Sequence, residues 1–165
     1  MLPLIVAASV AFGAPTVVVG GHLGIVGWQR SGNHAALLGL QAASRVRGRV
    51  LGGSLELDAA LARDRNAGAT LTTWPLRAAT TLDVVVRRRS AHWVTGLGPG
   101  VAVVASRIQT DDRRYGGVAI GPVLRARSGL DGPLTGKLRW QVGTGMAVRR
   151  GGVDWDLGVG LLVQP

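Results

Sequence analysis

The sequence predicts an all-β protein, a closed antiparallel up-and-down β-barrel of about eight strands. Three observations predict this fold. Apolar and polar residues alternate with a period of two along most of the chain, and short turns rich in glycine or charge separate the alternating stretches. The two clearest stretches each exceed the roughly 9–11 residues that a tilted strand needs to cross a bilayer.

The composition is that of a single domain with few large side chains to fill its core. The chain has 165 residues, of which 47% are apolar, but aromatic residues make up 4% and glycines number 26. Such a chain suits a barrel that turns its apolar face to lipid, because that barrel needs less core filling than a soluble protein. The absence of cysteine excludes disulfides and thiolate metal sites.

The formal net charge is +10, but the arginines are dispersed rather than gathered in one stripe. Most of them lie near the ends of the expected strands: Arg45, Arg47, Arg49, Arg63, Arg65, Arg87 to Arg89, Arg113, Arg114, Arg125, Arg127, Arg149 and Arg150. This distribution favours charged turns in water or among anionic head groups over a nucleic-acid partner.

The first 28 residues carry no formal charge. We expect residues 1–13 to be a signal peptide with a small-x-small cleavage site at Ala11-Phe12-Gly13, and residues 14–165 to form a single barrel domain. A membrane helix through about residue 28 is the alternative. The β-branched run Thr16 to Val19 and the glycines after it favour a strand there.

The expected strands follow the alternation in chain order. They cover 16–29, a stretch up to Val46 that follows a loop at 30–34, then 50–61, 70–86, 92–106 and 115–127, and finally a hairpin over 133–163. The turns between them are expected at 47–49, 63–68, 87–89, 110–114, 128–132 and, within the hairpin, 149–152. Pro99 argues mildly against the strand 92–106, because proline removes a ladder donor.

Charged residues within the strands fall on one parity, opposite to the apolar residues. A charge on a lipid-facing position costs about 2–4 kcal/mol at the bilayer midplane, so in a membrane barrel we expect this parity to point inward. We expect an interior polar network of Arg45, Glu56, Asp58, Arg77, Asp83, Lys137, Arg139, Asp154 and Asp156. Within it, Glu56 and Arg77 are a candidate pair, and an eight-stranded barrel filled in this way has no solute pore.

In this architecture the region from Thr16 to Val163 resembles the small eight-stranded outer-membrane β-barrels of Gram-negative bacteria. The resemblance rests on the alternation, on the signal-like start and on outward tryptophans, and on no residue motif. It implies an outer-membrane location, a structural or surface-interacting role and a monomer in contact with membrane lipid. The expected membrane-interface aromatics are Trp74, Trp93, Trp140 and Trp155.

A basic rim follows if both termini are periplasmic. The residues that would share it are Arg30, Arg63, Arg65, Arg113, Arg114, Arg149 and Arg150. Guanidinium groups bind phosphates through charge-assisted hydrogen bonds, so lipopolysaccharide is the expected anionic lipid.

Two other functions stay open. A soluble exported barrel of the lipocalin or avidin type would turn the apolar parity inward and bind a small apolar ligand. A lipid A hydrolase could use Ser90-x-His92 or Ser31-x-x-His34. The histidines lack paired metal-binding spacing, so we expect no metal, no cofactor and no catalytic residue.

Overall fold

The computed structural model describes residues 15–165 except 29–33, 47–49, 67, 89 and 151, and the expected signal peptide therefore lies outside the described residues. Eight strands follow one another along the chain: β1 (Pro15–Trp28), β2 (His34–Val46), β3 (Leu51–Asn66), β4 (Ala69–Arg88), β5 (Ala91–Gln109), β6 (Arg114–Thr135), β7 (Leu138–Arg149) and β8 (Gly152–Val163). No helix among these residues is long and apolar enough to span a membrane.

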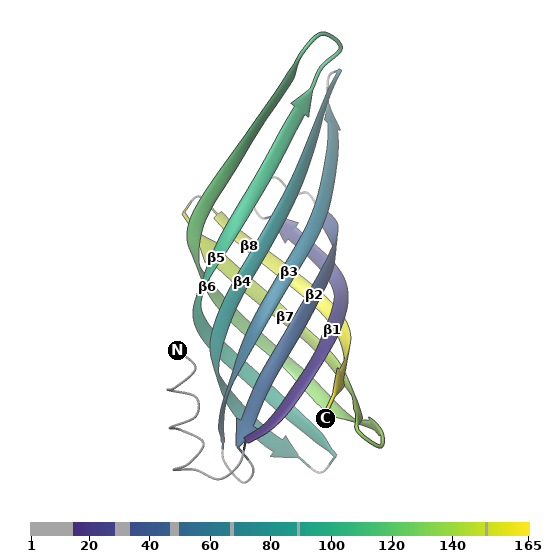
Figure 1. The fold of residues 1–165 in the computed structure, drawn as a ribbon, viewed down its shortest axis with the longest axis vertical. Helices are drawn as coiled ribbons and strands as arrows, with labels where there is room; N and C mark the ends of the chain where they lie inside the picture. The colour runs from purple at the N-terminus through teal and green to yellow at the C-terminus, as the bar shows by residue number, and fades with distance from the viewer. Residues whose placement is uncertain (1–14, 29–33, 47–49, 67, 89, 151) are drawn as a thin grey trace.

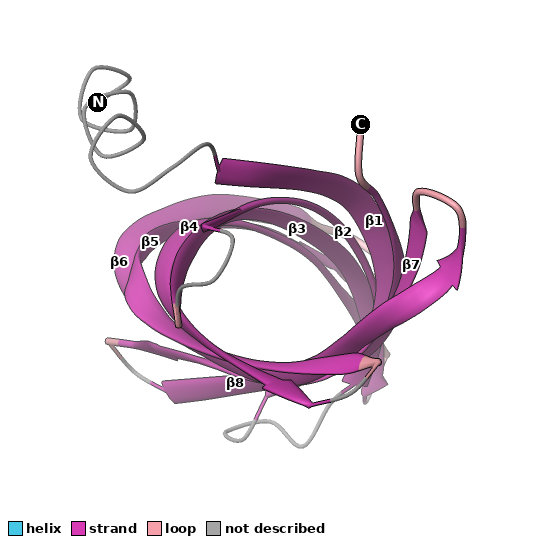
Figure 2. Ribbon diagram, turned by 90° about the horizontal axis from the view of Figure 1, so that it is seen from below, coloured by secondary structure: helices cyan, strands magenta, loops and turns pink. Residues whose placement is uncertain are grey.

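Each strand pairs antiparallel with its neighbours in the chain, and β1 also pairs with β8, so the sheet closes (Figures 1 and 2). This confirms the expected up-and-down barrel. The alternation explains it, because residues of one parity line the interior and residues of the other face outward.

The strand registers fix the stagger of the barrel. A row of paired residues that begins at Ile120 in β6 runs through β5, β4, β3, β2, β1, β8 and β7, and returns to β6 at Leu130, ten residues further along. With eight strands this stagger tilts them by about 40–45° from the barrel axis. An interior of this size holds side chains and little else.

Four strands continue beyond the rest of the barrel. β3, β4, β5 and β6 have 16, 20, 19 and 22 residues, whereas β1, β2, β7 and β8 have 12 to 14. Figure 1 shows them rising above the other four as a projecting sheet, at the end opposite to Pro15 and the C-terminus. We call the part of β3–β6 beyond the rim, residues 62–66, 68–76 and 103–120, the projecting sheet.

Two expected turns are shorter in the structure. Most of the expected loop 63–68 belongs to β3, and Gly68, with φ of 80°, lies in the short connection to β4. The expected loop 110–114 ends one residue earlier, at the start of β6. Charged side chains did not end these strands, because the projecting sheet leaves their side chains in solvent.

The expected turn at 128–132 is wrong, since these residues lie inside β6. The chain turns at 136–137 instead, where Gly136 has φ of 51°. The turn-forming residue types serve other purposes here: Gly129 lies close to the Val142 backbone, and the Trp140 ring covers Gly132. The strand β7 therefore starts at Leu138, five residues after the expected start of the hairpin at residue 133.

The register of β6 against β7 can be tested by cross-linking, because the chain has no native cysteine. Leu130 pairs with Val142, so Leu130→Cys with Val142→Cys should form a disulfide on oxidation of the refolded barrel. The matched control combines Leu130→Cys with Val148→Cys, which is six residues, or about 20 Å, further along β7. Non-reducing gels and intact mass measure both. A cross-link in the control alone would contradict this register.

Candidate functional site

Two arginines of β6 occupy the centre of the barrel interior. Arg125 donates from Nε to Glu56 at 2.9 Å and from Nη1 to Asp156 at 2.6 Å. Arg127 donates to the other Glu56 oxygen at 2.9 Å and to Asp83 at 2.7 Å. Every one of these side chains is at least nine-tenths buried, so Glu56 is held between two guanidinium groups from the opposite wall.

A third arginine extends this network. Arg77 on β4 donates from Nε to its register partner Asp58 at 2.8 Å and reaches Asp156 at 3.0 Å. His22 on β1 lies 3.0 Å from Asp58 on its other side. The carboxylate of Asp156 thus joins Arg77 to Arg125, and strands from all around the barrel are linked through one network.

Two smaller ion clusters lie above and below. Toward the end with Pro15 and the C-terminus, Arg139 donates to Asp131 at 3.2 Å and contacts His92 Nδ1 at 3.1 Å. Toward the opposite end, Arg149 pairs with Asp154 at 3.1 Å.

Glycines make room for the network. A Cβ atom at Gly145 would overlap the Arg125 guanidinium, one at Gly96 would overlap Asp83, and one at Gly39 would overlap His22 and Asp58. The missing side chains on these inward positions leave the space that the charged groups fill. The high glycine content is thus partly a requirement of a narrow interior that holds long arginines.

A small cavity lies in the described part of the interior. It has a volume of about 50 Å³ and lies beside the network, lined by Gln41, Gln141 and parts of the ion pairs. That volume fits one or two water molecules.

The outward face is apolar in the same span. Leu23, Leu38, Leu40, Val159 and Leu82 are each about three-fifths exposed or more. The apolar parity therefore points outward and the charged parity inward, which rules out the inverted faces of the lipocalin-like alternative.

The expected interior residues are distributed as follows. Glu56, Asp58, Asp83, Asp154 and Asp156 are buried inside, and the side chains of Arg77 and Arg139 are 8% and 15% exposed. In contrast to our expectation, Lys137 lies exposed in the turn between β6 and β7. The Arg45 side chain lies outside the described part of the chain.

The expected Glu56–Arg77 pair is also corrected, because register places Arg77 directly opposite Asp58. Arg125, Arg127 and Asp131 also take part in the interior ion pairs, although they were not among the expected interior residues. Their parity could have identified the two arginines, since both alternate with the outward Leu124 and Ala126. Because a turn is expected at 128–132, the sequence places both arginines at the end of a strand and not in its interior.

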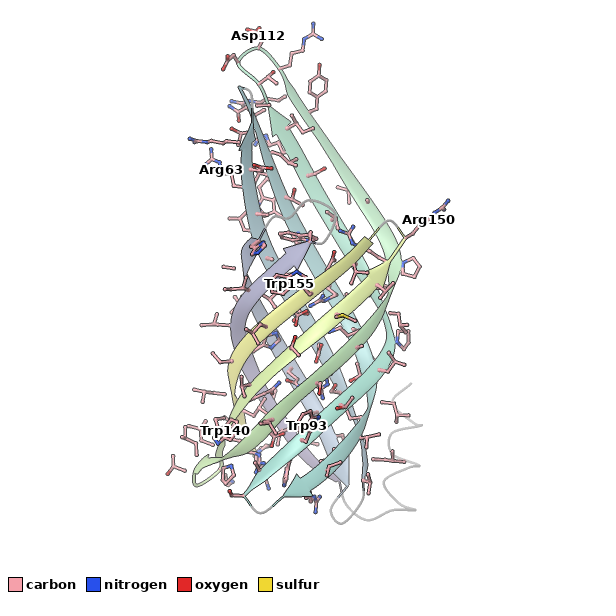
Figure 3. All side chains as sticks on the ribbon, turned by 180° about the vertical axis from the view of Figure 1, so that it is seen from behind. Arg63, Trp93, Asp112, Trp140, Arg150 and Trp155 are labelled. Atoms are coloured by element: carbon pink, nitrogen blue, oxygen red, sulfur yellow. The ribbon has the colours of Figure 1, made fainter. Side chains whose placement is uncertain are left out.

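The four expected interface tryptophans lie at three levels along the axis. At the tilt given above, one residue advances about 2.4 Å along the axis, and each step along a row of paired residues descends about 3 Å. On this scale Trp93 and Trp140 lie within about 1 Å of one level, with Trp74 about 25 Å and Trp155 about 18 Å above them. Figure 3 shows Trp93 and Trp140 near the lower end of the barrel and Trp155 well above them.

Each of two tryptophans lies flat over a glycine of the neighbouring strand. Trp155 covers Gly27, and its ring meets His34 edge-on with the centroids 5.3 Å apart. Trp140 covers Gly132 in the same way. These contacts fix the aromatic rings against the barrel wall.

The expected rim arginines that the structure describes all lie at the end opposite to Pro15 and the C-terminus. Arg63, Arg65, Arg113, Arg114 and Arg150 are exposed, whereas Arg149 is half-buried in its pair with Asp154. Arg63 and Arg150 mark this end in Figure 3. Arg30 lies outside the described residues.

The residues considered for catalysis are placed as follows. Ser90 is exposed in its turn, whereas the His92 ring is held by Arg139 in the interior. His34 faces outward against Trp155, and Ser31 lies outside the described residues. In the part of the chain that the structure describes, no group of three or more histidine or acidic side chains is placed to hold a metal ion.

No protein-family model and no curated protein sequence matches this chain. Solved structures do match its fold. Neisserial surface protein A aligns with a TM-score of 0.61 at 10% identity, covering 92% of this chain and 97% of that chain. A major outer membrane protein from Thermus thermophilus aligns with a TM-score of 0.61 at 13% identity, covering 92% and 99%.

The attachment invasion locus protein Ail of Yersinia pestis, solved with the heparin analogue sucrose octasulfate, aligns with a TM-score of 0.58 at 12% identity, covering 90% and 97%. The fold is therefore that of the small eight-stranded outer-membrane β-barrels. At these identities the likeness establishes the fold and no more.

The central network predicts a strong asymmetry between interior and rim substitutions. Arg125→Ala leaves Glu56 and Asp156 without a main partner, and breaking one side of a buried ion pair costs about 3–5 kcal/mol. Arg150→Ala, at an exposed turn, should change the free energy of unfolding by less than about 0.5 kcal/mol. Urea unfolding of the refolded barrels measures both. Equal stability of the two variants would show that the network does not hold the barrel together.

Proposed function

We propose that this protein is a non-enzymatic, monomeric β-barrel of an outer membrane, with a structural or surface-interacting role. One observation carries the proposal: a wide apolar belt covers the outside of a barrel whose inside holds ion pairs. In water that arrangement exposes apolar surface and buries charge. In a bilayer the apolar outer face contacts lipid, and the charged groups inside pair with one another.

The tryptophan levels support the position of the membrane. The axial distance of about 25 Å from Trp93 and Trp140 up to Trp74 equals the height of the apolar band in such barrels. In this position the end with Pro15 and the C-terminus is periplasmic, and the projecting sheet and exposed arginines are outside. The arginine rim contacts anionic groups at the membrane surface, including lipopolysaccharide phosphates.

The membrane position predicts the effect of outward charges. Leu38 lies about halfway between the level of Trp93 and Trp140 and that of Trp74, so Leu38→Arg should destabilise the inserted barrel by about 2–4 kcal/mol. Ile120→Arg, at the level of Trp74, is the matched control and should cost about 0–1 kcal/mol. The measurement is unfolding from phospholipid vesicles, after fractionation shows the wild type in the outer membrane with a compact unboiled band on gels.

A soluble wild-type protein in detergent-free buffer, or equal effects of the two arginines, would overturn this proposal. In either case the two outward positions would not differ in their depth in lipid.

We also propose that the interior is closed to solutes. The network crosses the lumen, and the cavity of about 50 Å³ beside it holds one or two waters. Planar bilayers containing the wild type should therefore show no stable conductance. Arg125→Ala with Arg127→Ala shortens both central side chains and is the positive comparison. Porin-like conductance of the wild type would contradict the closed interior.

A further inference from the structure

Four arginines of the projecting sheet lie on one face, the outward one. Arg63 pairs with Thr72, which pairs with Arg107, so these residues form one row across β3, β4 and β5. The next row toward the tip runs from Arg65 through Thr70 and Gln109 to Arg114. Residues paired directly across strands share a face, and so do residues two apart in one strand.

The four arginines are available for a ligand. All four are exposed, and among the described residues none of them makes a salt bridge. Asp64, between Arg63 and Arg65, points to the opposite face by alternation. The face is therefore a concentration of positive charge with threonine hydroxyls between its arginines.

The spacing divides the arginines into two pairs. Arg63 and Arg65 are about 7 Å apart along β3, and Arg107 and Arg114 are about 8 Å apart across β5 and β6. About 10–14 Å separates the two pairs, with Thr70 and Thr72 of β4 between them. Each pair can clamp one phosphate, and the two clamps suit a headgroup with two phosphates.

An apolar hollow continues the same outward face below the arginines. Its volume is about 490 Å³, and its lining includes Ala59 and Ala78 together with leucines and valines of β2 to β5. Between the hollow and the arginines lies Trp74 at the upper level. The arginines above suit the phosphates of a lipid headgroup, and the apolar hollow below suits its acyl chains.

We propose that this face binds one lipid of the outer leaflet whose headgroup carries two phosphates, with its acyl chains in the hollow. The inference rests on the proposed membrane position and deepens it, because it replaces a diffuse rim with a defined site. Arg107, which was not among the expected rim residues, is part of the site. Arg113, Arg149 and Arg150 are not.

Native mass spectrometry of the folded full chain in detergent, titrated with diphosphoryl or monophosphoryl lipid A, tests the site. The wild type should prefer the diphosphoryl lipid. Arg63→Gln with Arg107→Gln removes one guanidinium from each pair and should weaken diphosphoryl binding roughly ten- to hundredfold, removing the preference. Arg113→Gln with Arg150→Gln removes the same charge from turns at this end and should leave the preference intact.

If both double variants lost the same affinity for the diphosphoryl lipid, binding would depend only on the total positive charge, and the proposed site would be overturned. Competition by inorganic pyrophosphate at the same concentration as the lipid would overturn the lipid as the ligand. Ala78→Trp fills the hollow and should weaken both lipids equally, whereas unchanged binding would overturn the placement of the acyl chains. A compact unboiled band for each variant shows that the barrel is folded, and failure of the wild type to insert into vesicles would instead refute the proposed function.

Discussion

Closure of the sheet is the constraint on which the rest of this structure depends. Once β1 pairs with β8, the backbone groups of the shared barrel wall are satisfied within the wall, and each strand residue must point either inward or outward. The stagger of ten residues over eight strands then sets a narrow interior. Every inward side chain has to fit into that space, and its polar and charged groups have to find their partners there.

The interior meets this demand with ion pairs rather than with large apolar side chains. Arg125 and Arg127 reach across the lumen to Glu56, Asp83 and Asp156. Three guanidinium groups and four carboxylates compensate one another, since each would be costly to bury alone. Glycines such as Gly145 provide the room, so the glycine content and the low aromatic content follow from the same geometry.

The same closure separates the roles of the arginines, although their distribution in the sequence looks uniform. Inward parity within the barrel places Arg77 and Arg125 in the network. Outward parity beyond the rim places Arg63 and Arg107 in a row on the projecting sheet. Residue type alone does not distinguish these positions, but parity together with height along the axis does.

Much of the fold could be predicted, because alternation is a local property. It identified the strands, their number and the outward tryptophans. Strand ends were less predictable: residues 128–132 have turn-forming types but lie inside β6, where glycines serve close packing against β7. That one error concealed Arg125 and Arg127 and placed Lys137 inside, although it lies in the exposed turn.

The sequence by itself determined which residues share a face, because successive side chains of a strand alternate regardless of what the strand pairs with. Only the tertiary structure decided which carboxylate pairs with which arginine, that β3 to β6 extend beyond the other strands, and that four arginines align in two rows. These properties depend on register. Register is set jointly by all eight strands, since a shift of two residues preserves every face but changes every partner, as the replacement of the expected Glu56–Arg77 pair by Asp58–Arg77 illustrates.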